Sequence, residues 1–199
     1  MGYSDFSLDG VIRRFELKYS ETADLFGKQP KLDGSQLLAE TLKRNVPLAL
    51  ASNTEKSRAE MITAPILIEL REQLQNQISL FSGIDFNVDS ERGLSGSCDF
   101  LIGNSSGLLL VAAPVILIVE AKQENLNGGL GQCVAEMLAA RIFNEREGNE
   151  IPGIYGAVTS GTTWKFIHLK NQLIEIDLTE YYLNDINKIL GILASAINN

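Results

Sequence analysis

The chain has 199 residues, of which 45% are hydrophobic and 21% are charged, a composition that suits an ordinary globular protein with one sizeable core. Its formal net charge is −8 and no cluster of lysines and arginines stands out, which argues against tight, non-specific binding to duplex nucleic acid by the isolated chain. One histidine and two cysteines, Cys98 and Cys133, are too few for a zinc site or a disulfide framework. We expect a cytoplasmic protein with free thiols and no signal peptide or membrane segment.

The first half of the chain predicts helices more clearly than strands. Residues 6–18 show both a helical spacing and a strand-like alternation of apolar residues, so both assignments stay open. A short helix is expected at about 35–44, with a serine as its N-cap, and residues 45–47 should break the chain. The strongest helix is predicted at 54–77, where Pro65 should kink or stop its first part.

The second half predicts strands that alternate with helices. Strands are expected at 80–88, around Asp99 and in the apolar run that begins at Val115, whereas 108–112 is either a further short strand or an irregular connection. A loop should follow at 125–129. The remaining elements are a helix, three strands and a last helix, at about 130–147, 154–159, 164–170, 173–178 and 186–197. This order predicts an α/β fold with a central mixed β-sheet flanked by helices.

The most informative stretch of the chain is the aliphatic run that ends in Glu120-Ala121-Lys122. A buried strand explains the run, and strand alternation puts Glu120 and Lys122 on the same side of the pleat. The short strand upstream carries one acid, Asp99. Two carboxylates on neighbouring strands can hold a hard divalent cation, and an ammonium beside them can orient or polarise a water. The pattern therefore predicts a phosphodiesterase site that uses Mg²⁺ or Mn²⁺.

The same residues resemble a known signature. Asp99 followed by Glu120-Ala121-Lys122 is similar to the D…(D/E)-x-K motif of the restriction-endonuclease-like (PD-(D/E)xK) nuclease superfamily. Residues 54–62, followed by Ala64-Pro65-Ile66-Leu67, look like the opening helix of the nuclease domains of type I restriction-enzyme motor subunits. The resemblance covers roughly residues 54–170 and implies a restriction-endonuclease-like core. It also implies a Mg²⁺- or Mn²⁺-dependent nuclease whose substrate is DNA.

The resemblance gives a role to each residue of the motif. Asp99 and Glu120 would bind the metal ion, with the Ala121 carbonyl as a further oxygen ligand. Lys122 would orient the attacking water and stabilise the charge that develops on the phosphate. In a plainer interpretation, Asp99 is a solvent-exposed acid at a strand end, and Glu120 and Lys122 form a surface ion pair worth little stability.

Two further candidates come from helices. Glu60 could supply a third acid to the cation, as the resemblance implies, with Glu55 competing for that role; alternatively, both belong to the solvated face of an amphipathic helix. Gln132, which follows Gly131, is similar to the position where several branches of the superfamily place a Gln. The Gln motif of the exonuclease branch ends in Tyr, however, and this chain has Glu136 there.

Three other features have structural interpretations. His168 shares a strand face with Trp164 and Phe166, and we interpret it as a partly buried, hydrogen-bonded side chain. Cys133 is interpreted as a core thiol. The glycine-rich stretch 128–131 follows no phosphate-loop pattern and lacks the required lysine, so it is interpreted as a loop.

Two functions therefore remain open, besides an enzyme of another kind that uses Asp99 and Glu120 as an acid–base pair, which no substrate motif supports. The first is a metal-dependent phosphodiesterase that acts on DNA. The alternative is a non-catalytic nuclease-fold subunit or nucleic-acid adaptor, with a protein partner or as a homodimer, which the acidic composition would suit. In either case residues 1–50 are expected to be an N-terminal extension packed on a nuclease-like domain of residues 51–199, and no membrane is involved.

Overall fold

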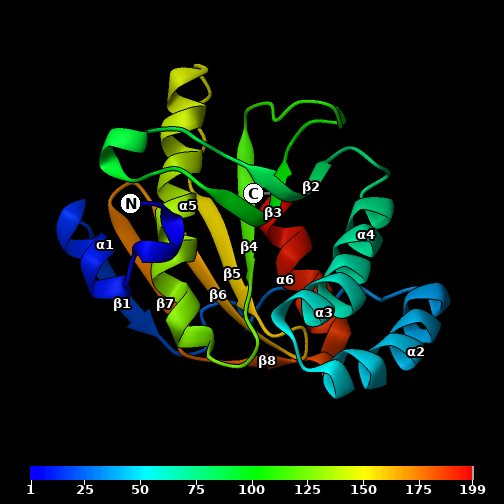
Figure 1. Cartoon of the computed structure of the whole chain (residues 1–199). Helices are drawn as coiled ribbons and strands as arrows, with labels where there is room; N and C mark the ends of the chain where they lie inside the picture. The colour runs from blue at the N-terminus through cyan, green and yellow to red at the C-terminus, as the bar shows by residue number, and fades with distance from the viewer. Residues whose placement is uncertain (199) are drawn as a thin grey trace.

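The computed structural model describes residues 1–198 and is built on one eight-stranded mixed sheet (Figure 1). The strands are β1 (Lys18–Thr22), β2 (Ser79–Asp85), β3 (Ser97–Gly103), β4 (Val115–Ala121), β5 (Ile154–Thr159), β6 (Thr163–Lys170), β7 (Leu173–Asp177) and β8 (Tyr181–Tyr182). They run in the order β1-β7-β6-β5-β4-β3-β2, and β8 pairs with β6. The β1–β7 and β4–β5 pairs are parallel and the others are antiparallel.

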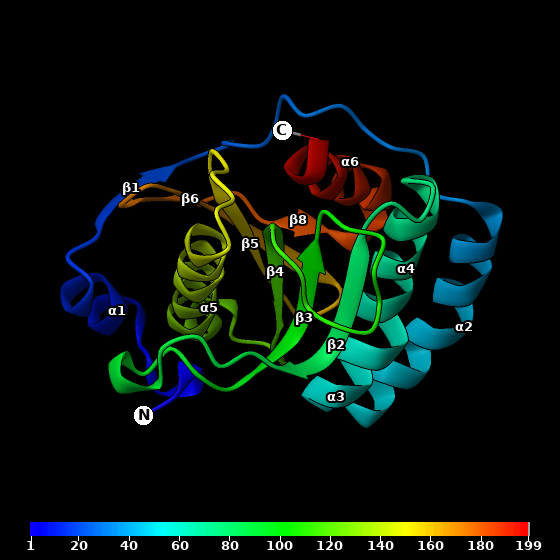
Figure 2. The same cartoon turned by 90° about the horizontal axis from the view of Figure 1, so that it is seen from above.

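Helices cover both faces of the sheet (Figure 2). They are α1 (Leu8–Arg14), α2 (Gln36–Ser52), α3 (Glu55–Arg58), α4 (Ala64–Gln73), α5 (Leu126–Arg146) and α6 (Ile186–Asn198), and a π-helical segment (Ala59–Thr63) joins α3 to α4. One hydrophobic core lies between the sheet and α5, with α1 behind it. A second core packs α2, α4 and α6 against the other face. The predicted α/β fold with a central mixed sheet is confirmed.

The strand β4 lies in the interior of the sheet, and every residue of this strand is buried. Antiparallel β3 flanks it on one side and parallel β5 on the other, and α5 is the crossover between β4 and β5. A strand with neighbours on both edges and cores on both faces is expected to be apolar, which explains its sequence up to Val119. The element order α4–β2–β3–β4–α5–β5 is consistent with a restriction-endonuclease-like core.

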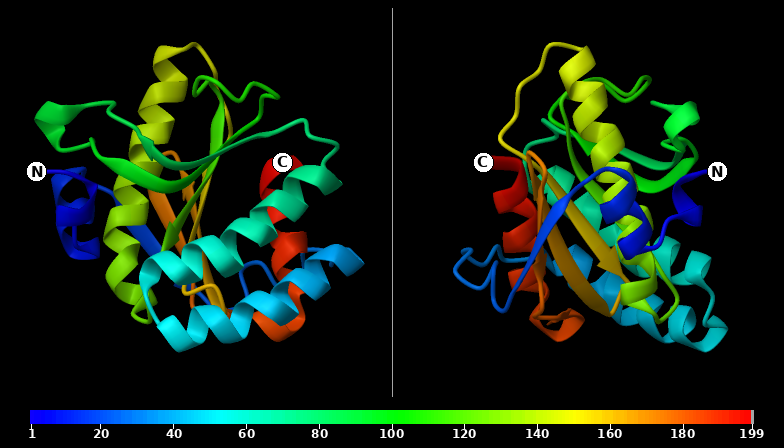
Figure 3. Two further views of the ribbon diagram at one scale, coloured as in Figure 1. Left: turned by 45° about the vertical axis from the view of Figure 1, so that its right-hand side comes forward. Right: turned by 90° about the vertical axis from the view of Figure 1, so that its left-hand side faces the viewer.

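The first fifty residues contribute to both the sheet and the helical layers. The ambiguous segment 6–18 contains α1 and leads into β1, so its helical and strand-like patterns belong to successive elements. Figure 3 shows the N-terminal segment lying along α5. Gly131 of α5 allows this contact, because a Cβ atom there would lie 2.3 Å from the Phe6 carbonyl oxygen.

Two predicted helix boundaries are wrong in the first half of the chain. The helix expected to end near residue 44 continues through Pro47 to Ser52, because its apolar face continues to the fully buried Ala49. It ends at Asn53, which adopts the left-handed conformation. The single helix predicted at 54–77 is divided into α3, the π-helical segment and α4, and Pro65 lies in the first turn of α4.

The loop predicted at 125–129 is also wrong. Asn125 is the N-cap, with its side chain accepting a hydrogen bond from the Gly128 N–H, and α5 begins at Leu126. The glycines lie inside the helix because it packs closely: a Cβ atom on Gly129 would lie 2.8 Å from a Val158 methyl group. Residues 108–112 form an irregular connection rather than a strand.

Candidate active site

The strands β3 and β4 separate at the predicted metal ligands. Their register of paired residues stops at Phe100 and Val119. Beyond that pair, Asp99 Oδ2 accepts a hydrogen bond of 2.8 Å from the backbone N–H of Ala121. This bond places the Asp99 carboxylate beside Glu120. Burial raises the pKa of Asp99, opposed by the Ala121 N–H, by Lys122 and by the interaction with Glu120.

Glu120 is almost completely buried, with 1% of its surface exposed. Its Oε1 atom accepts a hydrogen bond of 2.6 Å from Lys122 Nζ, whereas its Oε2 atom accepts no hydrogen bond. Burial, and then the neighbouring Asp99 charge, raise the pKa of Glu120 to about 8, although Lys122 opposes the shift. The Lys122 charge therefore only partly offsets the cost of burying the carboxylate form of Glu120 beside Asp99.

The Lys122 ammonium joins three elements at the end of β4. Besides Glu120, it contacts Gln132 Oε1 of α5 at 3.3 Å and Glu55 Oε2 of α3 at 3.9 Å. Burial lowers the pKa of Lys122, but Glu120, Glu55 and Asp99 together raise it above its ordinary value. Lys122 therefore stays protonated at neutral pH, with its charge held within the site.

The two helical glutamates lie at different depths. Both line a cleft of about 260 Å³ with Asp99 and Phe100. Glu55 contacts Lys122, whereas Glu60 is 61% exposed and forms an ion pair of 3.6 Å with Lys56. Of the two, Glu55 is the one whose carboxylate reaches the Asp99–Glu120–Lys122 group.

Sequence reasoning missed one acid at this site. Glu136 is fully buried on α5, and its Oε1 atom accepts a hydrogen bond of 3.1 Å from Gln132 Nε2. Burial and the Glu120 charge raise the pKa of Glu136 well above its ordinary value. A signal was available: Glu136 is the single charged residue in the otherwise apolar run 133–140 of a helix.

The oxygen ligands at this site are of the kind that a hard cation prefers, but the side chains alone supply too few of them. Within residues 1–198, no group of three or more His, Cys, Asp or Glu side chains is arranged to hold a metal ion. Asp99 and Glu120 supply two carboxylates, and the unpartnered Glu120 Oε2 is the kind of atom that a cation would satisfy. The remaining ligands would have to be backbone and water oxygens, and the Ala121 carbonyl is the backbone oxygen that the motif predicts.

His168 is a partly buried, hydrogen-bonded side chain and Cys133 is a core thiol, in agreement with their structural interpretation. His168 Nδ1 lies 3.1 Å from Glu175 Oε2, and the ring stacks on Tyr155 with the centroids 4.4 Å apart. Burial lowers the pKa of His168, and Glu175 opposes this shift. Cys133 is a fully buried free thiol.

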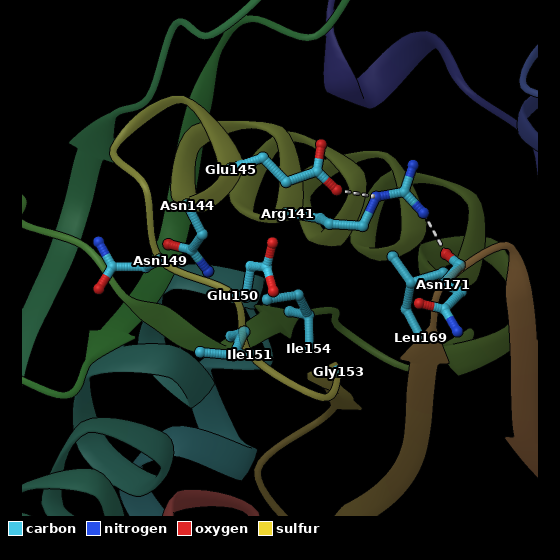
Figure 4. Close-up of a pocket in the computed structure, with 10 residues that line it drawn as sticks. All are labelled: Arg141, Asn144, Glu145, Asn149, Glu150, Ile151, Gly153, Ile154, Leu169 and Asn171. Carbon is cyan, nitrogen blue, oxygen red and sulfur yellow. Dashed lines mark hydrogen bonds and ion pairs between the residues drawn. The ribbon is translucent and has the colours of Figure 1, made fainter.

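A second cavity, of about 370 Å³, lies at the C-terminal end of α5 (Figure 4). Arg141 forms an ion pair with Glu145 and donates a hydrogen bond to the carbonyl oxygen of Asn171 in its wall. The cavity contains none of the predicted site residues. It is therefore separate from the candidate active site.

Comparisons with known proteins add little to this geometry. The sequence matches neither a known protein family nor a curated protein. Among solved structures, the chain is similar to one described as a cryo-EM structure of the DrdV–DNA complex, with 12% identity and a TM-score of 0.46. That likeness covers 82% of this chain but only 14% of the other chain, and at this TM-score it supports no further conclusion. No helix in residues 1–198 has the length and apolar character needed to cross a membrane.

Proposed function

We propose that this chain is a divalent-metal-dependent phosphodiesterase that acts on DNA. The observation that carries the proposal is the convergence of Asp99, Glu120 and Lys122, in which a buried carboxylate oxygen of Glu120 accepts no hydrogen bond. An unsatisfied buried carboxylate costs stability, so its presence at a strand end favours a functional explanation. The choice of DNA as substrate rests on the resemblance of the motif to the nuclease superfamily.

Each residue of the site has a defined task in this proposal. Asp99 and Glu120 would hold Mg²⁺ or Mn²⁺, with the Ala121 carbonyl as a further ligand. The bound ion would act as a Lewis acid toward a phosphoryl oxygen and lower the pKa of water. Lys122 orients the attacking water and stabilises the negative charge that develops on the phosphate. Gln132 and Glu55 restrict the position of the Lys122 ammonium.

A non-catalytic nuclease-fold subunit or adaptor is the second candidate. The net charge of −8 favours it, because a duplex-binding surface ordinarily gains affinity from lysines and arginines. In that case Glu120 and Lys122 would form a buried ion pair with no reaction to perform. The two candidates differ in whether the chain cleaves DNA by itself.

A cleavage assay tests the proposal directly. Supercoiled plasmid, linear duplex and single-stranded DNA are incubated with the wild-type chain in Mg²⁺, in Mn²⁺ and in EDTA, with Asp99→Asn as the matched variant. We expect cleavage by wild type that EDTA abolishes and that Asp99→Asn loses. Calorimetry should show one dominant Mg²⁺ or Mn²⁺ site in wild type and weaker binding in the variant. Equal metal binding by both proteins, or no cleavage of any substrate, would overturn the proposal.

A further inference from the structure

Residues 1–198 contain four buried carboxylates, and they fall into two groups. Asp177 accepts hydrogen bonds from the Phe26 and Thr179 N–H groups and the Tyr181 hydroxyl. Glu69 accepts them from Ser35 and Gln73. These two acids join segments of the fold. In contrast, Glu120 and Glu136 each have a buried oxygen that accepts no hydrogen bond.

The fold gains nothing evident from Glu136. Glu136 lies in an apolar run of α5, and its hydrogen bond is with Gln132, its neighbour one helical turn away. Burying a carboxyl group with an unsatisfied oxygen destabilises the folded state relative to an apolar side chain of similar volume. A group that the fold would be more stable without, and that lies behind a candidate active site, has a reason in function.

The geometry behind Lys122 shows what Glu136 can do. A glutamine side chain has a donor end and an acceptor end, and the acceptor must face an ammonium, which only donates. Gln132 Nε2 donates to Glu136 Oε1, and Gln132 Oε1 accepts from Lys122 Nζ at 3.3 Å. Glu136 accepts from the donor end of the Gln132 amide and Lys122 donates to its acceptor end, so the two partners together favour the orientation in which the amide oxygen points toward Lys122.

We propose that Glu136 is a positioning residue, which holds the Gln132 side chain in the orientation that presents its amide oxygen to the Lys122 ammonium. Glu136 is hydrogen-bonded to Gln132 and acts through that side chain, whereas Glu120 and Asp99 affect Glu136 as neighbouring charges. The catalytic consequence rests on the proposed function, whereas the orientation of Gln132 does not. These two parts can be tested separately.

Two variants at one position separate positioning from packing. Glu136→Met removes the acceptor at similar volume, and Glu136→Gln retains an acceptor oxygen for Gln132. For wild type and each variant, we would measure the melting temperature, the Mg²⁺ affinity and the single-turnover cleavage rate. Crystal structures of the same proteins would show whether Gln132 contacts Lys122.

We expect Glu136→Met to melt about 2–4 °C higher than wild type, because a buried polar group is removed. Its Gln132 amide should turn away from Lys122, and its cleavage rate should fall about tenfold through kcat, with the Mg²⁺ affinity unchanged. Glu136→Gln should retain the contact and most of the rate. A residue needed only for packing would instead lose stability and activity together.

Two results would overturn the inference. One is a Glu136→Met structure in which Gln132 still contacts Lys122 as in wild type, whatever the activity. The other is a Glu136→Met protein that cleaves as fast as an active wild type. If wild type itself cleaves no substrate, the proposed function fails, and the crystal structures alone decide whether Glu136 positions Gln132.

Discussion

At the scale of single residues, the site depends on the environment of one ammonium group. Lys122 contacts Glu120, Gln132 and Glu55, which come from three different elements. A lysine at a solvent-exposed strand end would gain little from such contacts. Lys122 is instead held against a carboxylate that is 1% exposed, so its charge acts where solvent screening is weak.

Replacing Lys122 by methionine should therefore abolish catalysis and leave the fold intact. Removal of an electrostatic stabiliser typically lowers the rate about 10²–10³-fold, and we expect this loss in a plasmid cleavage assay. The control is Lys56→Met, because Lys56 lines the cleft beside Asp99 but is 82% exposed. Both variants should show a cooperative thermal transition. A Lys122→Met protein that cleaves DNA as fast as wild type would exclude the mechanism.

The raised pKa of Glu120 predicts how stability depends on pH when no metal is bound. The folded chain keeps the Glu120 proton up to about pH 8, whereas the unfolded chain releases it near the ordinary value of 4.5. The folded state then binds more protons across this window, so the free energy of unfolding should fall as the pH rises from 4.5 to about 8.

Urea unfolding in EDTA at several pH values checks this pH dependence of the free energy of unfolding, with Glu120→Gln as the control. Wild type should lose stability relative to Glu120→Gln as the pH increases, and the difference should level off above about pH 8. Glu136, whose pKa is also raised, is present in both proteins and does not create the difference by itself. A constant difference between the two proteins across the window would show that Glu120 is not perturbed by its surroundings.

The sequence could identify only part of this residue cluster. Asp99, Glu120 and Lys122 were identifiable because polar residues at the ends of apolar strands need an explanation. Glu136 and the contact of Glu55 with Lys122 were harder to predict, because they depend on how α5 and α3 are rotated about their axes. The π-helical segment after α3 changes that rotation, and no sequence motif predicts this π-helical segment.

At the scale of elements, α5 connects the site to the N-terminal segment. Its first turns carry glycines that allow two close contacts, one with Phe6–Leu8 and one with Val158 and Lys122. Farther along, the same helix carries Gln132 and Glu136. The position of α5 therefore controls both the packing of the N-terminal segment and the groups behind Lys122.

Gly131→Ala should destabilise the protein by about 1–3 kcal/mol, the usual cost of inserting a methyl group into a filled space. The methyl group would lie 2.3 Å from the Phe6 carbonyl oxygen and 2.4 Å from the Ser7 carbonyl carbon, both backbone atoms that cannot rotate away. Chemical denaturation would measure the loss. Gly107→Ala is the matched control, since the nearest atom there lies 3.5 Å away, and its stability should change little. Equal stability of the two variants would mean that the N-terminal segment is not closely packed against α5 at Gly131.

The strands and the last helix could be predicted from apolar runs and spacing, whereas two helix boundaries could not. Proline at 47 and glycines at 128–131 normally interrupt helices, so local preference predicts a break at both places. The burial of Ala49 and the close approach of α5 to its neighbours overcome that preference. Such tertiary contacts are invisible in the local sequence.

At the scale of the whole molecule, charge is the feature that limits binding. The 17 lysines and arginines are outnumbered by 25 acidic residues and form no cluster in the sequence that would release counterions from a phosphate backbone. Lys122, at the centre of the site, is already surrounded by Glu120, Glu55 and Asp99. Long-range electrostatic attraction therefore contributes little to the binding of DNA by this chain.

The affinity for duplex DNA should accordingly be weak and should fall only slightly as salt is added. Fluorescence anisotropy with Asp99→Asn, in which cleavage is expected to be lost, would give the dissociation constant between about 50 mM and 200 mM salt. The same measurement on wild type in EDTA, where the metal is removed, provides the comparison. A nanomolar affinity with a steep salt dependence would show that a basic surface is formed by residues far apart in the sequence.

The pairing of β1 with β7 has a consequence for how the chain is made. The Phe26 N–H, just after β1, bonds to Asp177 at the end of β7, across 151 positions of sequence. During synthesis the first strand therefore leaves the ribosome long before its partner exists. Contacts of such sequence separation slow folding, and the waiting edge can pair with other strands. Ribosome-bound chains halted before β7 should accordingly be more sensitive to proteolysis near residues 18–22 than chains released at full length.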